Sequence, residues 1–215
     1  MRWMFGLFMI AWLHHLPAQT HQFGIQLQFQ HRLLATQLKS DPIDPSLTAR
    51  GLPGFGLGIN YLKRLNTRFA LNAEANLLFD ADEYVSQRFP AVAPDVSIAE
   101  LVLPLDLYFV LVRRKDWRPF VGLGLSYGYQ LTTGTTYEVF YPKHQFGGRI
   151  SLGLEKVFRQ FTCAPRLVYQ QVLNEQIRAD NWFTTVNYRY LHVQRLQFTL
   201  AFYAPPRRRH ALLDF

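Results

Sequence analysis

The chain has little of what fixes the fold of many secreted and membrane proteins. It has one cysteine in 215 residues, Cys163, so an internal disulfide cannot form. It has no apolar run of about 18 residues, the length that a membrane-spanning helix needs. The sequence therefore predicts neither a disulfide-stapled domain nor a bundle of membrane helices. Cys163 is interpreted as a small apolar residue.

Motifs that carry chemistry are also scarce. Two glycine-rich stretches, 54–58 and 122–128, lie inside alternating segments rather than between a strand and a helix, so they are interpreted as strand glycines and not as phosphate loops. The histidines show no metal-ligand spacing, and no Ser/His/Asp set is evident. The sequence predicts no catalytic residue, no cofactor, no metal site and no enzyme.

The first 19 residues have the pattern of an export signal. One cation, Arg2, precedes an apolar run from Trp3 to Leu13, and Ala18-Gln19 provides a small-residue exit. This order is typical of a cleavable secretory signal, and the apolar run is too short to span a bilayer as a helix. We expect residues 1–19 to be a signal peptide that is cleaved after Ala18 or Gln19.

After this segment, eight stretches alternate apolar and polar residues with a period of two. In the clearest one, Phe23, Ile25, Leu27 and Phe29 fall on one face, and glutamines with one glycine fall on the other. Such a period indicates strands whose two faces meet different surroundings. We predict strands at 22–34, 54–62, 68–79, 96–112, 118–131, 147–158, 161–172 and 188–203.

The connections between these strands alternate in length. The long ones are 35–53, 80–95, 132–146 and 173–187, and the short ones are 63–67, 113–117 and 159–160. Outer-membrane barrels combine short periplasmic turns with long outer loops. Residues 20–204 are therefore predicted to form an all-β, eight-stranded antiparallel up-and-down transmembrane β-barrel in the outer membrane. Both termini would be periplasmic, and 205–215 would be a basic periplasmic tail.

A soluble barrel also alternates, but its polar face would then lie outside. Here that face is rich in glycine, as in 54–58 and 122–128, and glycine in a strand marks close approach. Small residues suit the narrow lumen of an eight-stranded barrel, where they leave room for larger polar neighbours. The sequence favours the apolar face toward lipid.

Charged residues recur on the predicted lumen face. Because buried ions persist when they are paired and hydrogen-bonded, we interpret them as a structural charge network, with an ion path as the alternative. We expect at least one direct ion pair within the group Glu100, Arg149, Glu155 and Arg166. The full predicted network is Glu74, Glu100, Asp106, Arg149, Glu155, Arg166 and Arg195.

Several other residues are candidates for lipid contact. His31 and His192 lie near the outer ends of the first and last predicted strands, which are neighbours where the barrel closes, so the two could meet at the outer-leaflet interface. Arg207, Arg208 and Arg209 of the tail can hold phosphates, with a solvated unstructured end as the alternative. The net charge of +8 is concentrated in predicted turns and in the tail, which favours anionic headgroups over nucleic acid.

Four segments carry a resemblance to a known family. They are 100–109 (ELVLPLDLYF), 119–124 (PFVGLG), 146–155 (FGGRISLGLE) and 196–203 (LQFTLAFY). Together they resemble the PorT-like outer-membrane β-barrel family of Bacteroidetes, although the basic tail departs from that pattern. The resemblance implies an eight-stranded barrel and, for the best-known member, a part in type IX secretion. It transfers no functional residues.

The sequence thus leads to a functional hypothesis with two alternatives. We expect a non-enzymatic outer-membrane barrel that acts as a scaffold or accessory in envelope assembly or protein export. Its partners would be outer-membrane lipid and other envelope or secretion proteins, contacted through loops and turns. The alternatives are a lipid-modifying enzyme, acyltransferase or phospholipase, that uses His31 or His192, and a small ion channel.

Overall fold

Eight long strands make up most of the described chain. The computed structural model describes residues 21–37, 48–85, 95–112, 116–134, 139–140, 143–173, 178–180, 185–186 and 190–205. The long strands are β1 (His21–Gln37), β3 (Pro53–Arg64), β4 (Phe69–Val85), β5 (Asp95–Val110), β6 (Trp117–Gly134), β8 (His144–Val157), β9 (Thr162–Val172) and β12 (Tyr190–Tyr203). The predicted signal peptide, 1–19, and most of the predicted tail lie outside the described residues.

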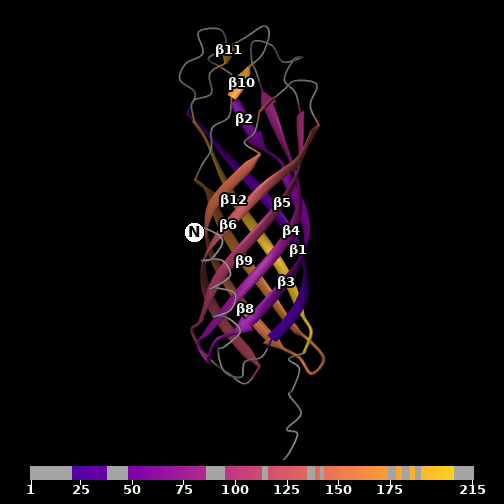
Figure 1. Cartoon of the computed structure of the whole chain (residues 1–215), viewed down its shortest axis with the longest axis vertical. Helices are drawn as coiled ribbons and strands as arrows, with labels where there is room; N and C mark the ends of the chain where they lie inside the picture. Colours follow the sequence, from indigo (N-terminus) through magenta and orange to yellow (C-terminus); the bar gives the residue numbers. More distant parts are fainter. Residues whose placement is uncertain are drawn as a thin grey trace, which may run out of the picture.

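The eight strands close into an antiparallel barrel, as predicted (Figure 1). The ring runs β4-β3-β1-β12-β9-β8-β6-β5, and the β4–β5 pairing closes it. A path that starts at Phe23 on β1 and steps from each residue to its register partner on the next strand goes once around the barrel and returns to β1 at Leu33. The shear of the barrel is therefore ten residues. This stagger goes with a strand tilt of roughly 40°.

The two ends of the barrel differ. The short connections between β3 and β4, between β5 and β6 and between β8 and β9 share one end, here called the short-turn end, with the start of β1 and the end of β12. At the opposite, long-loop end the strands run further than the sequence predicted: β4 continues to Val85 and β5 begins at Asp95. Residues 80–85 and 95 of the predicted loop 80–95 are therefore barrel wall.

Short strands also occupy the other predicted loops. β2 (Thr48–Gly51) pairs with β4 and extends the wall beyond β3. β7 (Val139–Phe140), β10 (Arg178–Asp180) and β11 (Thr185–Val186) form a separate three-stranded sheet from the connections on either side of β8 and β9. The sequence missed all four because each is only two to four residues long and shows no period.

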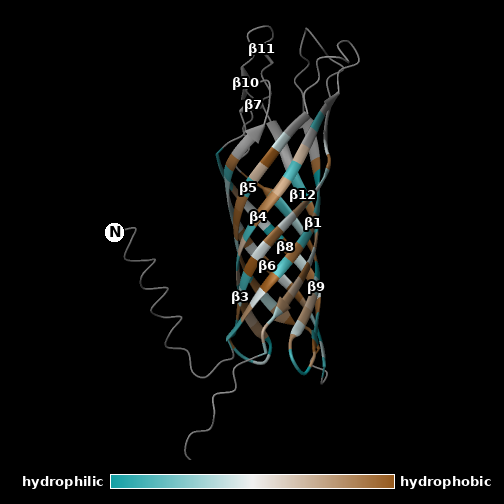
Figure 2. Cartoon of the chain, turned by 90° about the vertical axis from the view of Figure 1, so that its right-hand side faces the viewer, coloured by the Kyte–Doolittle hydropathy of each residue, from teal (hydrophilic) through white to brown (hydrophobic). Residues whose placement is uncertain are grey.

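The outer surface of the wall is apolar and the inner surface is polar. On β6, Leu123 and Leu125 are 65% and 69% exposed, whereas the inward Ser126 is buried. Figure 2 shows this alternation of hydropathy along the strands. Large exposed apolar side chains on every side of a barrel whose interior holds the polar groups are the pattern of a wall that faces lipid. Among the described residues, no helix has the length and apolar character to cross a membrane.

Candidate functional site: the barrel lumen

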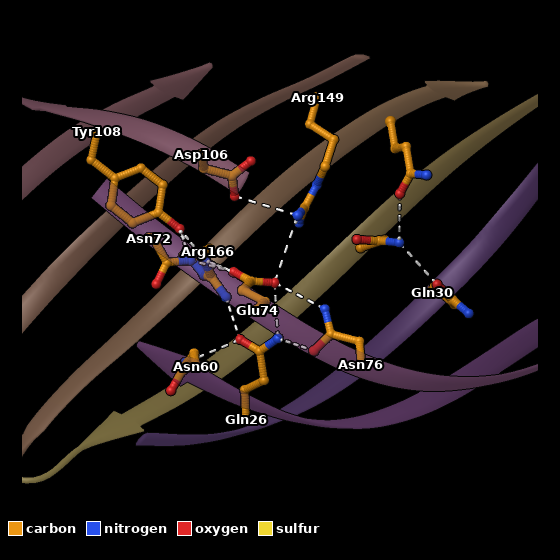
Figure 3. Close-up of polar contacts among 12 residues, drawn as sticks. Gln26, Gln30, Asn60, Asn72, Glu74, Asn76, Asp106, Tyr108, Arg149 and Arg166 are labelled. Carbon is orange, nitrogen blue, oxygen red and sulfur yellow. Dashed lines mark hydrogen bonds and ion pairs between the residues drawn. The ribbon is translucent and has the colours of Figure 1, made fainter. Parts of the chain in front are cut away.

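An arginine that crosses the lumen forms the centre of the polar interior (Figure 3). Arg166 on β9 reaches Glu74 on β4, and its Nη1 lies 2.5 Å from Glu74 Oε1. The two strands stand opposite each other in the ring. Arg166 Nη2 also donates to Gln26 Oε1 at 2.5 Å, and its Nη1 donates to the Tyr108 hydroxyl. One guanidinium thus ties β9 to three other strands.

A second arginine balances the charge at this level. Arg149 Nη1 lies 3.6 Å from Glu74 Oε2 and 3.4 Å from Asp106 Oδ2. Glu74 is held further by amide donors: Gln26 and Asn76 at 2.9 Å each, and Asn72 at 2.5 Å. All of these groups are buried. Two guanidinium groups facing two carboxylates give a centre without net charge, which lowers the cost of burying each ion.

Toward the long-loop end lies a second pair from opposite strands. Arg195 on β12 donates from Nη2 to Glu100 on β5 and, at 3.4 Å, to Gln145 Oε1. Arg195 is 0% and Glu100 1% exposed. Glutamines fill the space between the two ion-paired levels: Gln197 donates to Gln30 at 3.0 Å, and Gln30 donates to Asp80 at 2.6 Å.

An apolar layer and a third charged group occupy the short-turn end. The layer consists of buried residues from six of the eight long strands: Leu62, Ala70, Tyr108, Val110, Phe120, Ala164, Ala201 and Tyr203. At the same end Glu155 pairs with Arg64 at 2.5 Å and, more loosely, with Arg118 at 3.9 Å. Side chains therefore fill the interior along the barrel: ion pairs and glutamines occupy its middle and the part toward the long-loop end, and the apolar layer with the Glu155 group occupies the short-turn end.

Glycines allow this filling. A Cβ on Gly124 would collide with Asp106 Oδ1 and lie 2.6 Å from the carbonyl oxygen of Leu105. A Cβ on Gly128 would collide with Glu100 Oε1. The glycine-rich stretch 122–128 therefore makes space for the carboxylates of the neighbouring strand β5, which gives it a steric role in the wall.

The structure places all seven residues of the predicted network inside the barrel, none more than 6% exposed. It corrects the pairing, however. Each member of the group Glu100, Arg149, Glu155 and Arg166 makes an ion pair, but with a partner outside that group. Arg64, which pairs with Glu155, lies in the predicted turn 63–67 and was not among the predicted lumen residues. In the structure it ends β3 and continues the inward phase of that strand.

The predicted meeting of two histidines at the rim is also corrected. β1 and β12 are neighbours, and His31 is exposed on the outer face. His31 pairs in register with Leu196, however, and His192 pairs with Ala35. Their backbone positions are four residues apart along the ladder, about 13 Å at the rise of a strand. Arg207, Arg208 and Arg209 lie outside the described residues.

Within the described ranges, no group of three or more His, Cys, Asp or Glu side chains is arranged to hold a metal ion. The Glu74 carboxylate faces guanidinium and amide donors, and the carboxylates of Asp106 and Glu100 each face a guanidinium group. Such an arrangement joins opposite walls of the barrel.

Comparison with known proteins gives the fold. No family model and no curated protein matches the sequence. The structure is similar to the outer membrane protein OprG from Pseudomonas aeruginosa, with a TM-score of 0.64 and 10% identity over 87% of this chain and 95% of that chain. Neisserial surface protein A is also similar, with a TM-score of 0.48 and 12% identity over 85% of this chain and 96% of that one. The likeness to OprG shows that this chain has the fold of an outer-membrane β-barrel, and together with the apolar outer surface it supports an outer-membrane location.

Proposed function

We propose that this chain is a non-enzymatic outer-membrane barrel that serves as a scaffold or accessory in envelope assembly or protein export. The observation that carries the proposal is the filled, charge-paired lumen, in which arginines on β9 and β12 reach carboxylates on the opposite wall. A barrel closed in this way offers no wide aqueous path. Its surfaces for other proteins are therefore the loops and turns at its two ends.

The orientation forms part of the same proposal. Short turns face the periplasm in outer-membrane barrels, so the short-turn end and both termini are assigned to the periplasm. The resemblance to PorT-like barrels of Bacteroidetes favours a type IX secretion-like role among the possible forms of export. The partners would be envelope proteins that meet the turns around Asn66 and Gln160 or the loops at the other end.

Photo-crosslinking in living cells tests this proposal. A crosslinking amino acid at Asn66, at Gln160 or at Lys143, all exposed at the two ends, is expected to give a discrete adduct with another envelope protein at one of the ends. The matched control is Leu125, which faces lipid. Adducts at the end positions that are no different from those at Leu125 would contradict a scaffold role.

Lipid analysis tests the non-enzymatic part. A strain that lacks the protein is expected to keep the same lipid A and phospholipid species as the parent strain. A change in acylation that the wild-type gene restores, and that the variant His31→Ala does not, would point to the lipid-modifying alternative instead.

A further inference from the structure

One lysine stands alone among apolar neighbours on the outer face of the barrel. Trp117, Lys156, Cys163, Phe202 and Ile25 are paired in register in that order across five strands. Trp117 and Ile25 are 44% and 66% exposed, so this row faces outward. In the ion pairs found among the described residues, Lys156 has no part.

The ammonium group of Lys156 is nevertheless held in place. Its Nζ lies 4.2 Å from the centroid of the Trp117 ring and 5.9 Å from that of Phe158. A cation over an aromatic face is stabilised by the ring quadrupole, but the charge itself is not neutralised. The position is the short-turn end of β8, where an apolar wall gives way to polar surroundings and a lysine can extend its head out of the hydrocarbon.

A second cation lies in the adjoining turn. Phe158 N–H donates to the Phe161 carbonyl at 2.8 Å, which closes a turn with Arg159 and Gln160 exposed at its tip. The rings of Phe158 and Phe161 stack at 4.7 Å and flank this turn. Along the chain, Lys156 and Arg159 thus flank an exposed aromatic residue, Phe158.

The neighbouring carboxylates leave this pair of cations in excess. Glu155 points inward and is engaged by Arg64 and Arg118. Asp116 is exposed in the neighbouring connection, and its backbone carbonyl accepts the Val157 N–H at 2.8 Å. Its one negative charge is fewer than the two positive charges of Lys156 and Arg159. Among the described residues, neither Lys156 nor Arg159 takes part in an ion pair. An anionic group at the depth of the lipid headgroups would complement the two cations.

We infer that Lys156 and Arg159, with Trp117 and Phe158, form a binding site for the headgroup of an anionic phospholipid in the leaflet at the short-turn end. The two cations take the phosphate, and the aromatic rings pack against the glycerol and the first acyl carbons. Interleaved cations and rings at the membrane boundary favour lipid over an acidic protein. The inferred lipid site depends on the barrel fold and not on the proposed scaffold role, so each of the two can be refuted without the other.

Native mass spectrometry of the purified, folded barrel tests the site. The barrel is equilibrated with equal amounts of phosphatidylglycerol, which is anionic, and phosphatidylethanolamine, which is zwitterionic. We expect the wild type to retain phosphatidylglycerol preferentially. Lys156→Gln is expected to weaken that retention about fivefold, and the double variant Lys156→Gln/Arg159→Gln by more than tenfold. Lys156→Arg is expected to preserve it.

The matched control is Lys143→Gln, which removes an exposed lysine just before β8 at the other end of the barrel. Equal retention of the two lipids by the wild type would overturn the inference without any substitution. A loss in the double variant no larger than in Lys143→Gln would also overturn it. Unheated and boiled gel mobility establishes that each variant is folded before the lipid is measured.

Discussion

The ion pair between Arg195 and Glu100 offers a clean measure of how much the lumen network stabilises the barrel. Both side chains are buried, and among the described residues Glu100 has Arg195 as its ion-pair partner. Removing one member of a buried pair typically costs about 3–5 kcal/mol, because the other charge is left uncompensated. A Coulomb estimate for unit charges at 4 Å and an effective dielectric of 20, about 4 kcal/mol, agrees.

We therefore predict that Arg195→Met and Glu100→Leu each lower the free energy of unfolding by about 3–5 kcal/mol. Arg195→Met also leaves the Gln145 Oε1 acceptor without its donor, which adds about 1 kcal/mol. The double variant Arg195→Met/Glu100→Leu removes both charges and is expected to lie closer to the wild type than either single variant. The coupling energy of the cycle is then about 3 kcal/mol or more.

The assay is urea unfolding of the barrel in phospholipid vesicles, followed by intrinsic tryptophan fluorescence. Arg68→Met serves as the control, because Arg68 is exposed in the short turn between β3 and β4, and a change within about 0.5 kcal/mol is expected there. If the single variants cost no more than Arg68→Met, or if the double variant costs the sum of the two, the pair does not stabilise the lumen as argued.

Two further predictions concern the wall. Gly124→Ala is expected to lower the free energy of unfolding by about 1–3 kcal/mol, because the new Cβ meets Asp106 and the Leu105 carbonyl. Gly148→Ala lies on the outer face, where a Cβ meets nothing within 4 Å, and is expected to be neutral or to stabilise the barrel by up to about 1 kcal/mol. Equal effects of the two substitutions in urea unfolding would contradict the assigned faces. Leu125→Arg, at a side chain 69% exposed to the outside, is expected to cost about 2–4 kcal/mol in vesicles, as a cation facing mid-bilayer lipid does. A barrel that keeps its unfolding free energy with Arg at this position would not have lipid there.

The sequence was sufficient to assign the two faces of each of the eight long strands, since a period of two is a local property of the chain. Glu74, Arg149 and Arg166 fall inside for the same reason that Leu123 and Leu125 fall outside. The ends of the strands at the long-loop end were harder to predict from the sequence, because the segment around Asp80 contains polar residues and prolines that are also typical of loops.

Partners across the lumen could not be predicted in this way. Arg166 meets Glu74 because β9 and β4 stand opposite each other and because the shear brings their inward rows to the same height. The shear is the joint result of all eight strand pairings, and no single stretch of sequence encodes it. The same holds for His31 and His192: their strands are neighbours as predicted, but the register between the strands sets them four residues apart.

The central claim is that side chains fill and close the lumen, and planar-bilayer recording of the wild-type barrel tests it most directly. The paired arginines and carboxylates, the glutamine layer and the apolar layer at the short-turn end predict no stable conductance steps above the baseline of the bilayer. Reproducible ohmic steps from the folded wild type would contradict the account, and steps that grow in Arg149→Ala would identify the lumen as their path.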